Sequence, residues 1–354
     1  MKVLIVAGGT GGHLFPAIRL AEAVASQQAA GDILFVTSCR KQDRDILTDK
    51  GMAFRTVPVI ALQSRSPLAI LNFTIRLLAG TIKSLFLLLR FRPSWAIGFG
   101  GYVTGPILAW ACLLRIKTII HEQNVYPGKA NRILARFVDR IAVSFPETIG
   151  YLKGFEQKVI VSGNPLRRGL NRTNSRAGDT FTILAMGGSQ GAHALNKIIP
   201  EAMGSMGQDR KRALEIIHIA GHREKDEVIK AYQAKGIKHS VISFTQEIDK
   251  LYNACDFVIA RSGATTVSEL LYLAKPSILI PYPHGNAHQR LNARVLEQAG
   301  SAVLIEENTL TAGGLRDIVL KFMDRGALAK MSEGAKAMDT KDACAILLKE
   351  IQNA

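Results

Sequence analysis

The chain contains nearly the same glycine-rich loop twice, and this repeat constrains the fold more than any other feature. The sequence opens with KVLIVAGGTGGH, and FTILAMGGSQGAH recurs about half a chain later. In both copies a short apolar run typical of a buried strand ends in glycines and leads into a helical pattern. Such a unit directs backbone N–H groups and the positive end of a helix at a bound anion. Two copies predict two α/β domains that face each other across a cleft.

Length and alternation support this organisation. At 354 residues the chain favours two domains, and short β-runs alternate with helical segments in both halves, which predicts doubly wound parallel sheets. We expect the first helix to begin at Pro16, because proline suits a first helical turn. The segment after residue 163 is rich in arginine and asparagine, so we place the boundary there. The predicted parts are an N-terminal domain of residues 1–163, a C-terminal domain of 164–340, and a helix of 341–354 that packs back onto the first domain.

The net charge of +16 points to an anionic partner or to solvated surface lysines. The chain lacks aromatic residues interleaved with basic ones and has no recognisable nucleic-acid-binding module, so we expect no nucleic acid partner. Its four cysteines form no CxxC pair, which disfavours zinc and disulfides and fits a reducing cytosol. The apolar run at the start is too short for a signal peptide, so we expect no export.

The spacing within the loops narrows the chemistry. The loops read GGTGGH and GGSQGA; neither is GxGxxG, which disfavours a nicotinamide dehydrogenase, and no Walker lysine follows. Asp43-Arg44-Asp45 has the DxD form, in which two carboxylates can bind manganese. It lies in a polar, helix-like run away from the glycine loops, so we interpret it as a solvated helix start and predict no metal site.

Residues 261–300 carry a more specific pattern. Ser262-Gly263 forms a third glycine turn, and Glu269 lies in the early turns of the helix that follows. A carboxylate there can accept hydrogen bonds from both ribose hydroxyls, while nearby hydroxyl and N–H groups bind phosphate oxygens. The next loop is rich in amide and imidazole side chains, which suit sugar hydroxyls: His284, Asn286, His288, Gln289 and Asn292.

A set of motifs in fixed order over about residues 3–300 resembles the bacterial cell-wall N-acetylglucosaminyltransferases. The motifs are GGTGGHLFPA, GFGGYVTGP, HEQNVYPGKANR, GNPLR, MGGSQGAHALN and RSGATTVSELLYLAKPSILIPYP, followed by HQRLNA. The resemblance implies the GT-B fold, two Rossmann-like domains around a cleft. It implies inverting transfer of GlcNAc from UDP-GlcNAc to the C4 hydroxyl of MurNAc in lipid I, without a cofactor.

The resemblance also assigns the donor site. Ser189 and its loop would face the diphosphate, Glu269 would hold the ribose, and Gln289 would contact the GlcNAc hydroxyls. Thr245 stands where the family usually has an aliphatic residue against the uracil, so only a backbone contact is expected there; His288 stands where a second glutamine is common. The other expected binding residues are Thr10, Gly11, Gly12, Asn124, Arg167, Ala264, Thr265, Thr266, Val267 and Ser268.

For proton removal we favour His13, because the positive end of a helix favours the neutral imidazole that a base requires. The alternative is that His13 only positions the diphosphate of the acceptor, and Glu122 is the second candidate base. The second glycine loop would then bind the UDP diphosphate, and the first would face the pyrophosphate of the lipid acceptor.

Residues 67–92 form an apolar segment in which Arg76, Lys83 and Arg90 are seven residues apart and share one helical stripe. Such a helix can lie on an anionic membrane surface; the alternative is a buried helix whose cations reach outward.

The uncharged stretch 93–114 contains four glycines before Pro106, which predicts a strand, a loop and a helix rather than a membrane span. We expect a peripheral protein on the cytoplasmic side of the inner membrane, and the resemblance allows for contacts with other cell-wall synthesis proteins.

Two further enzyme classes remain open. A UDP-GlcNAc 2-epimerase-type isomerase would use the same two-domain arrangement without a lipid acceptor, and another GT-B lipid glycosyltransferase would share most motifs. Release of ManNAc from UDP-GlcNAc would identify the isomerase.

Overall fold

The computed structural model describes residues 1–27, 32–62, 64, 66–172, 180–188, 191–283 and 288–353. The chain divides into two compact units. Unit 1 comprises Met1–Arg167 and Lys341–Ala354, and unit 2 comprises Arg168–Thr340. Ser189, which the resemblance assigned to the donor diphosphate, lies outside the described residues.

Unit 1 is built on a parallel sheet whose described strands, seven in all, have the order β3-β2-β1-β4-β5-β6-β7. The strands are short and mostly buried because helices cover both faces. Their bounds are β1 Val3–Val6, β2 Ile33–Ser38, β3 Phe54–Val57, β4 Trp95–Gly98, β5 Lys117–Glu122, β6 Arg140–Val143 and β7 Val159–Val161.

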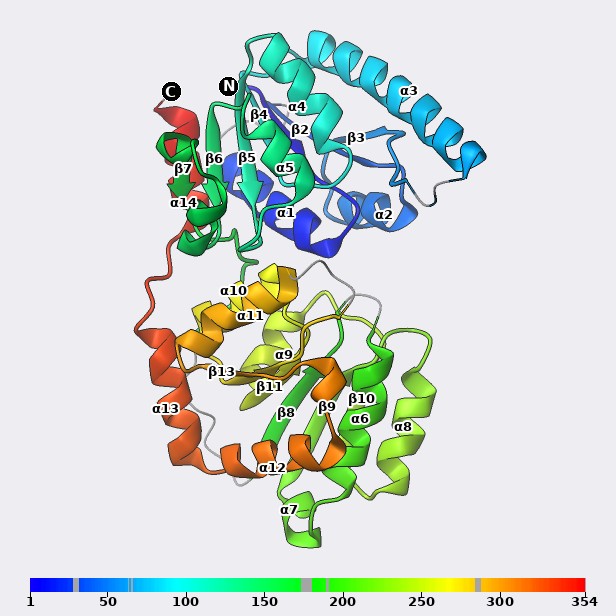
Figure 1. Ribbon diagram of the computed structural model, residues 1–354, viewed down its shortest axis with the longest axis vertical. Coiled ribbons are helices and arrows are strands. Elements are labelled where there is room, and N and C mark those ends of the chain that lie inside the picture. Colours follow the sequence, from blue (N-terminus) through cyan, green and yellow to red (C-terminus); the bar gives the residue numbers. More distant parts are fainter. Residues whose placement is uncertain are drawn as a thin grey trace. The chain divides into compact units, whose positions relative to one another are not determined.

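The alternation of side chains along β1 defines the two faces of this sheet. Val3 and Ile5 pack with α1 and α14, whereas Leu4 and Val6 pack with α4 and the end of α3 (Figure 1). The helices are α1 Gly11–Ala25, α2 Lys41–Asp49, α3 Pro67–Phe91, α4 Thr104–Leu113, α5 Lys129–Leu134 and α14 Ala343–Gln352, with the 3₁₀ turns η2 Pro146–Tyr151 and η3 Glu156–Lys158.

Unit 2 repeats the architecture with a described parallel sheet of six strands in the order β10-β9-β8-β11-β12-β13. Ile183 and Ala185 of the central strand pack against α6, α8 and α12, while α10 packs against α11 and α13. The strands are β8 Phe181–Met186, β9 Leu214–Ile219, β10 Lys238–Ile242, β11 Phe257–Ala260, β12 Ser277–Leu279 and β13 Ala302–Leu304. The helices are α6 His193–Gly204, α7 Gln208–Arg212, α8 Lys225–Ala234, α9 Ile248–Ala254, α10 Ala264–Leu273, α11 His288–Gln298, α12 Ala312–Phe322 and α13 Arg325–Lys336, with the 3₁₀ turn η4 Glu307–Thr309.

The predicted fold class is therefore confirmed, with two Rossmann-like parallel sheets. The expected start of the first helix is wrong: α1 begins at Gly11, and Pro16 lies inside it. Proline removes its own N–H bond to the carbonyl of the residue four positions earlier, and its ring crowds that carbonyl. Here that residue is Gly12 in the first turn, so the helix continues through Pro16.

The helix α3 has local signals at both ends. Ser66 caps its first turn by accepting a hydrogen bond from the backbone N–H of Ala69, and Pro67 occupies the first helical position. Arg92 ends the helix in the left-handed conformation, with φ of 51°. In Figure 1 the helix runs along the outer side of unit 1, and its first turns extend past the strands.

The C-terminal helix α14 completes the core of unit 1. It packs on α1, and Leu347 is fully buried in the same apolar cluster as Val3 and Leu20. A hydrogen-bonded ion pair between Arg140 and Glu350, with an N–O distance of 2.6 Å, joins α14 to the first residue of β6.

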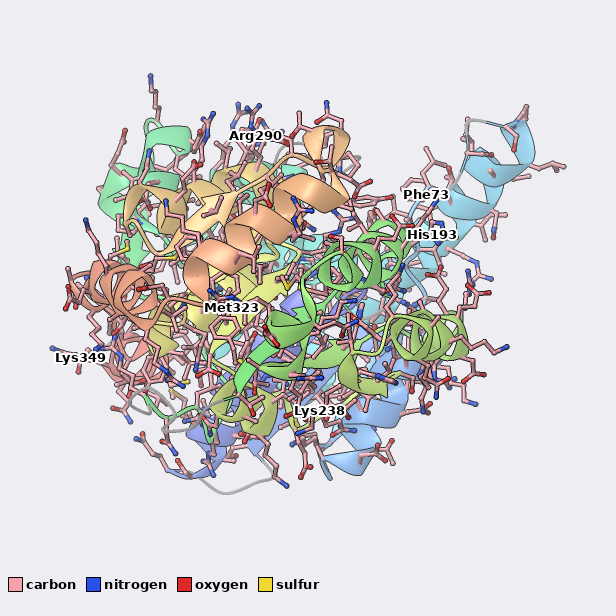
Figure 2. The ribbon with its side chains drawn as sticks, turned by 90° about the horizontal axis from the view of Figure 1, so that it is seen from below. Phe73, His193, Lys238, Arg290, Met323 and Lys349 are labelled. Atoms are coloured by element: carbon pink, nitrogen blue, oxygen red, sulfur yellow. The ribbon has the colours of Figure 1, made fainter. Side chains whose placement is uncertain are left out.

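We therefore expect Leu347→Ala to lower the free energy of unfolding by about 2–5 kcal/mol, because the substitution leaves a cavity in the core. Urea denaturation followed by circular dichroism measures this. Lys349→Ala, on the exposed side of the same helix (Figure 2), is the matched control and should change stability by less than about 0.5 kcal/mol. Equal effects of the two substitutions would show that α14 does not contribute to this core.

Candidate functional site

The glycine loops lie where the strand order of each sheet reverses. In unit 1 the reversal falls between β1 and β4, and in unit 2 between β8 and β11. Ligands of doubly wound proteins bind at the carboxyl ends of the strands at this point. The loop after β1 contains Gly8 and Gly9, and the loop after β8 contains Gly187 and Gly188. Both copies of the repeat therefore occupy the position where each unit can bind a ligand.

The first glycine loop is held from the side of β2 and α2. Asp43 accepts a hydrogen bond from the N–H of Gly9 at 2.9 Å, and the guanidinium of Arg40 donates to the carbonyl oxygen of Gly9. Asp43 is only 2% exposed, whereas Asp45 is exposed. The interpretation of this DxD as a solvated helix start is therefore wrong for Asp43. The reason is that β1 and β2 are neighbours, so the start of α2 lies beside the loop after β1.

His13 lies in the first turn of α1, directly after this loop. Its Nδ1 is 3.2 Å from the hydroxyl oxygen of Thr10, the N-cap residue. Gly100 packs against the ring, since a Cβ at Gly100 would come within 3.0 Å of Nε2. Burial lowers the pKa of His13 from its usual 6.5, while Glu122, a hydrogen bond with the backbone of Gly8, and Asp43 act in the opposite direction. The net effect favours the neutral imidazole, which is the form that a general base requires.

A second histidine of unit 1, His121, is fully buried in β5. It bonds the carbonyl of Gly163 through Nε2 at 3.0 Å and stacks on Phe99 with ring centroids 5.0 Å apart. Burial lowers its pKa to about 4. Its ring nitrogens are occupied within the unit, with Gln123 beside Nδ1 at 3.0 Å, so His121 supports the sheet while His13 lies at the loop.

Glu122 ends β5 and organises the segment that follows it. Oε1 accepts hydrogen bonds from the backbone N–H and side-chain amide of Asn124, at 2.9 and 3.1 Å. Oε2 accepts from the N–H of Gly128 and the amide of Asn131, both at 2.8 Å. The carboxylate is 2% exposed. Four donors on a buried carboxylate fix the loop and place Asn124 at the carboxyl end of the sheet.

Arg167 is the last residue of the first part of unit 1. Its guanidinium lies over the ring of Phe15, 4.5 Å from the centroid, so a cation–π contact holds it against α1. The structure thus places the arginine of GNPLR beside the helix that carries His13. Phe15 was not among the predicted site residues, although it lies two positions after His13.

In unit 2 close packing of backbone, rather than charged side chains, holds the second glycine loop. A Cβ at Gly187 would lie 2.4 Å from the backbone nitrogen of Ala192, and one at Gly191 would lie 2.3 Å from the carbonyl oxygen of Ala220. Gly191 also has a φ of +77°, which favours glycine. Backbone packing therefore requires these glycines, and α6 begins directly after them at His193.

The helix α10 follows β11, the second strand at the reversal of strand order in unit 2. Gly263 is its N-cap. Thr265 and Thr266 are half-buried in its first turn, while Ala264 and Ser268 are buried. Val267 is fully buried and belongs to the interior, so only its backbone can contact a ligand. The helix end offers N–H groups and two hydroxyls to an anion.

Glu269 is buried on α10, at 3% exposed. The hydroxyl of Tyr252 on α9 donates a hydrogen bond to its Oε2 at 3.0 Å and lies 4.0 Å from the sulfur of Met186. Met186 ends β8, just before the second glycine loop. Tyr252 therefore orients the carboxylate expected at the ribose. Its hydroxyl contact spans two helices, so no local pattern predicted it.

Gln289 and Thr245, also expected to contact UDP-GlcNAc, have hydrogen-bond partners nearby in the chain. Gln289 is the second residue of α11 and accepts a hydrogen bond from the N–H of Tyr282 at 2.9 Å. The hydroxyl of Thr245 accepts from the N–H of Glu247 at 2.9 Å, just before α9. Asn292 binds the carbonyl of Ser262 at 3.2 Å, which joins α11 to the loop after β11. His284 and Asn286 lie outside the described residues.

Two further observations concern metal binding and the membrane. No group of three or more His, Cys, Asp or Glu side chains suited to a metal occurs in the described part of the chain. Within that part, α3 alone is long and apolar enough to cross a membrane by length and composition, and 11% of its most apolar window is buried. Figure 2 shows Phe73 on the part of α3 that extends from unit 1.

The network around Glu122 gives a prediction that does not depend on function. Glu122→Gln replaces one acceptor oxygen by an NH₂ group that faces two donors, so buried N–H groups lose their partner. We expect the free energy of unfolding to fall by about 1–3 kcal/mol, measured by urea denaturation. Glu147→Gln, at an exposed acid of η2, should have almost no effect. A Glu122→Gln variant as stable as the parent would contradict this role of the carboxylate.

Comparison with known proteins agrees with this geometry. The glycosyltransferase family 28 N-terminal domain matches residues 3–143, and its C-terminal domain matches residues 182–346. Two relatives are named UDP-N-acetylglucosamine–N-acetylmuramyl-(pentapeptide) pyrophosphoryl-undecaprenol N-acetylglucosamine transferase. The one from Desulfotalea psychrophila is 38% identical over 91% of this chain and 88% of its own. The one from Syntrophus aciditrophicus is 36% identical over 99% of both.

A solved structure gives the same result at the level of the fold. The crystal structure of Acinetobacter baumannii MurG covers 100% of both chains with a TM-score of 0.78 at 26% identity. Both domains of one family thus match in order, and the relatives align along nearly their whole length. The chain belongs to glycosyltransferase family 28.

Proposed function

We propose that the protein is a hexosyltransferase that moves GlcNAc from UDP-GlcNAc to the C4 hydroxyl of MurNAc in undecaprenyl-pyrophosphoryl-MurNAc-pentapeptide, converting lipid I to lipid II in peptidoglycan synthesis. The observation that carries the proposal is the alignment over 99% of both chains with a relative of that name. The expected site motifs fall on the strand reversals of both sheets, which supports the assignment independently of identity.

In this proposal unit 2 binds the donor. The N-terminal turn of α10 and the loop of Ser189 hold the diphosphate, with Thr265 and Thr266 as hydroxyl donors. Glu269, oriented by Tyr252 at 3.0 Å, accepts hydrogen bonds from the ribose hydroxyls. Gln289 contacts the GlcNAc hydroxyls, and the backbone near Thr245 meets the uracil. The buried carboxylate thus gives specificity for a ribonucleotide.

His13 is the base in this proposal. The C4 oxygen of the acceptor forms a bond to C1 of GlcNAc, the bond from C1 to the phosphate oxygen breaks with inversion, and the hydroxyl proton passes to the imidazole. UDP leaves with the electron pair, and the positive end of α10 together with Arg167 stabilises the developing charge. Glu122, whose two oxygens accept four hydrogen bonds, supports the loop of Asn124 rather than taking the proton.

The test is to incubate the protein with labelled UDP-GlcNAc and a lipid I analogue and to separate lipid-linked from free label. We expect the label on the lipid. His13→Ala should reduce turnover about 100- to 10,000-fold, the range for loss of a general base, with little change in UDP affinity.

Two results would contradict this assignment in different ways. Free ManNAc without lipid labelling would identify the isomerase, and near-normal turnover of the His13→Ala variant would remove His13 as the base. Tyr151→Phe, at an exposed hydroxyl of unit 1, serves as a control for general damage to the unit.

We further propose that α3 docks the protein peripherally on the cytoplasmic face of the inner membrane, where a polyprenyl-linked acceptor resides. Large apolar side chains on α3 are 45–80% exposed: Leu68, Ile70, Leu71, Ile75, Leu78, Ile82, Phe86 and Leu89. Arg76, Lys83 and Arg90 are exposed on the same helix. Apolar insertion combined with cations at the headgroups is the mode of an interfacial helix.

We expect the protein to co-sediment with vesicles that contain phosphatidylglycerol and to bind less at high salt, because the lysine and arginine contribution is screened. Lys83→Gln should weaken partitioning about fivefold. Lys349→Gln, an exposed lysine on α14, is the matched control and should have no such effect. Absence of binding at low salt would refute membrane docking.

A further inference from the structure

Asp43 is a buried carboxylate that the proposed reaction does not use. Three donors converge on its Oδ2: the N–H of Gly9 at 2.9 Å, the hydroxyl of Ser38 at 2.7 Å and the hydroxyl of Thr37 at 3.4 Å. Asp43 also lies in the first turn of α2, where the positive end of the helix stabilises a negative charge. Three hydrogen bonds thus hold this carboxylate against the first glycine loop.

Both backbone polar groups of Gly9 in this loop are hydrogen-bonded to side chains. Gly9 donates its N–H to Asp43, and its carbonyl accepts from Arg40. Gly9 has a φ of +91°, which only glycine adopts without strain. A Cβ at Gly8 would lie 3.2 Å from Oδ2 of Asp43 and 2.9 Å from the hydroxyl of Thr37. The turn at Gly8 and Gly9 therefore has one conformation, set by α2 and the end of β2.

His13 also contacts this turn. The imidazole has a hydrogen bond with the backbone of Gly8 and a contact of 3.2 Å with the hydroxyl of Thr10. The loop after β4 covers the remaining side, since Gly100 packs on the ring. Asp43 and His13 thus both bind the backbone of one short turn, and a shift of that turn moves the imidazole.

We propose that Asp43 is a positioning residue for His13, which fixes the turn at Gly8 and Gly9 and supplies a negative charge to the imidazole through it. The inference deepens the proposed function, because it rests on His13 as the base of the transfer. It also gives the first residue of the Asp-Arg-Asp motif a positioning role in place of metal binding.

The charged groups that act on the imidazole come from two elements. Glu122 at the end of β5 and Asp43 on α2 both raise the pKa of His13, against the effect of burial. Arg40 is the cation held at the same turn, on the carbonyl of Gly9. Asp43→Asn keeps the size of the side chain and one acceptor oxygen but removes the charge, whereas Asp43→Ala removes both. The two variants therefore separate charge from geometry.

The experiment combines activity with an observation that does not require activity. The chain has eight histidines, so ¹⁵N-histidine labelling with His13→Ala for assignment gives the titration of His13 by NMR. We expect His13 to titrate at lower pH in Asp43→Asn than in the parent. The acid limb of kcat/KM should move to lower pH with it, because a base of lower pKa stays unprotonated further into acid.

Asp43→Ala should lower kcat about 10- to 100-fold, the effect of a misplaced catalytic group, with little change in the KM for UDP-GlcNAc. Asp45→Asn is the matched control: it changes the other acid of the motif, two residues away and exposed, and should leave titration and kcat as in the parent. If Asp43→Ala fails to fold, Asp43→Asn carries the test alone.

The outcomes distinguish the two proposals. An unchanged His13 titration and normal kcat in Asp43→Asn would overturn the role of Asp43. Equal effects of Asp43→Asn and Asp45→Asn would overturn it as well, because a general change of surface charge would then explain both. If the parent protein transfers no GlcNAc, the proposed function fails, while the NMR titration still decides whether Asp43 acts on His13.

Discussion

The reversal of strand order in each parallel sheet is the constraint on which both candidate sites depend. At β1 and β4, and again at β8 and β11, the carboxyl ends of neighbouring strands are left open for loops. Those loops approach other backbone so closely that side chains do not fit. A Cβ at Gly101 would meet the carbonyl oxygen of Gly8 at 2.3 Å, and one at Gly191 would meet that of Ala220 at the same distance. Glycine is thus required by loop packing before any ligand binds.

This explains which parts of the structure could be predicted from the sequence. A glycine loop between an apolar strand and a helix is a local signal, so the sequence predicts both glycine loops, although not the strand order around them. The apolar segment of residues 67–92 contains the helix α3, Pro67–Phe91, whose caps at Ser66 and Arg92 are local signals too. The start of α1 was placed too late, since proline was given more weight than the glycine turn that sets where the helix begins.

The residues that sequence reasoning missed act over long separations in the chain. Asp43 was assigned to a solvated helix because its immediate neighbours are polar; its burial follows from the pairing of β1 with β2. Tyr252 on α9 meets Glu269 on α10, 17 residues further along the chain. A usable signal did exist for Asp43. An acid in the first turn of a helix that follows the strand next to a glycine loop is well placed to accept an N–H from that loop.

The two copies of the glycine loop are therefore not equivalent in chemistry. In the second copy, backbone packing at Ala192 and Ala220 sets the turn. In the first copy a carboxylate occupies the N–H of Gly9, and a negative charge there opposes an anion at the same group. A pyrophosphate at the first loop would have to use the helix end beyond Thr10, while Asp43 raises the pKa of the His13 imidazole against the larger effect of burial. The repeated backbone motif thus has a different electrostatic setting in each unit, and the difference comes from a side chain outside the repeat. In the proposed function this difference suits anion binding in unit 2 and a general base in unit 1.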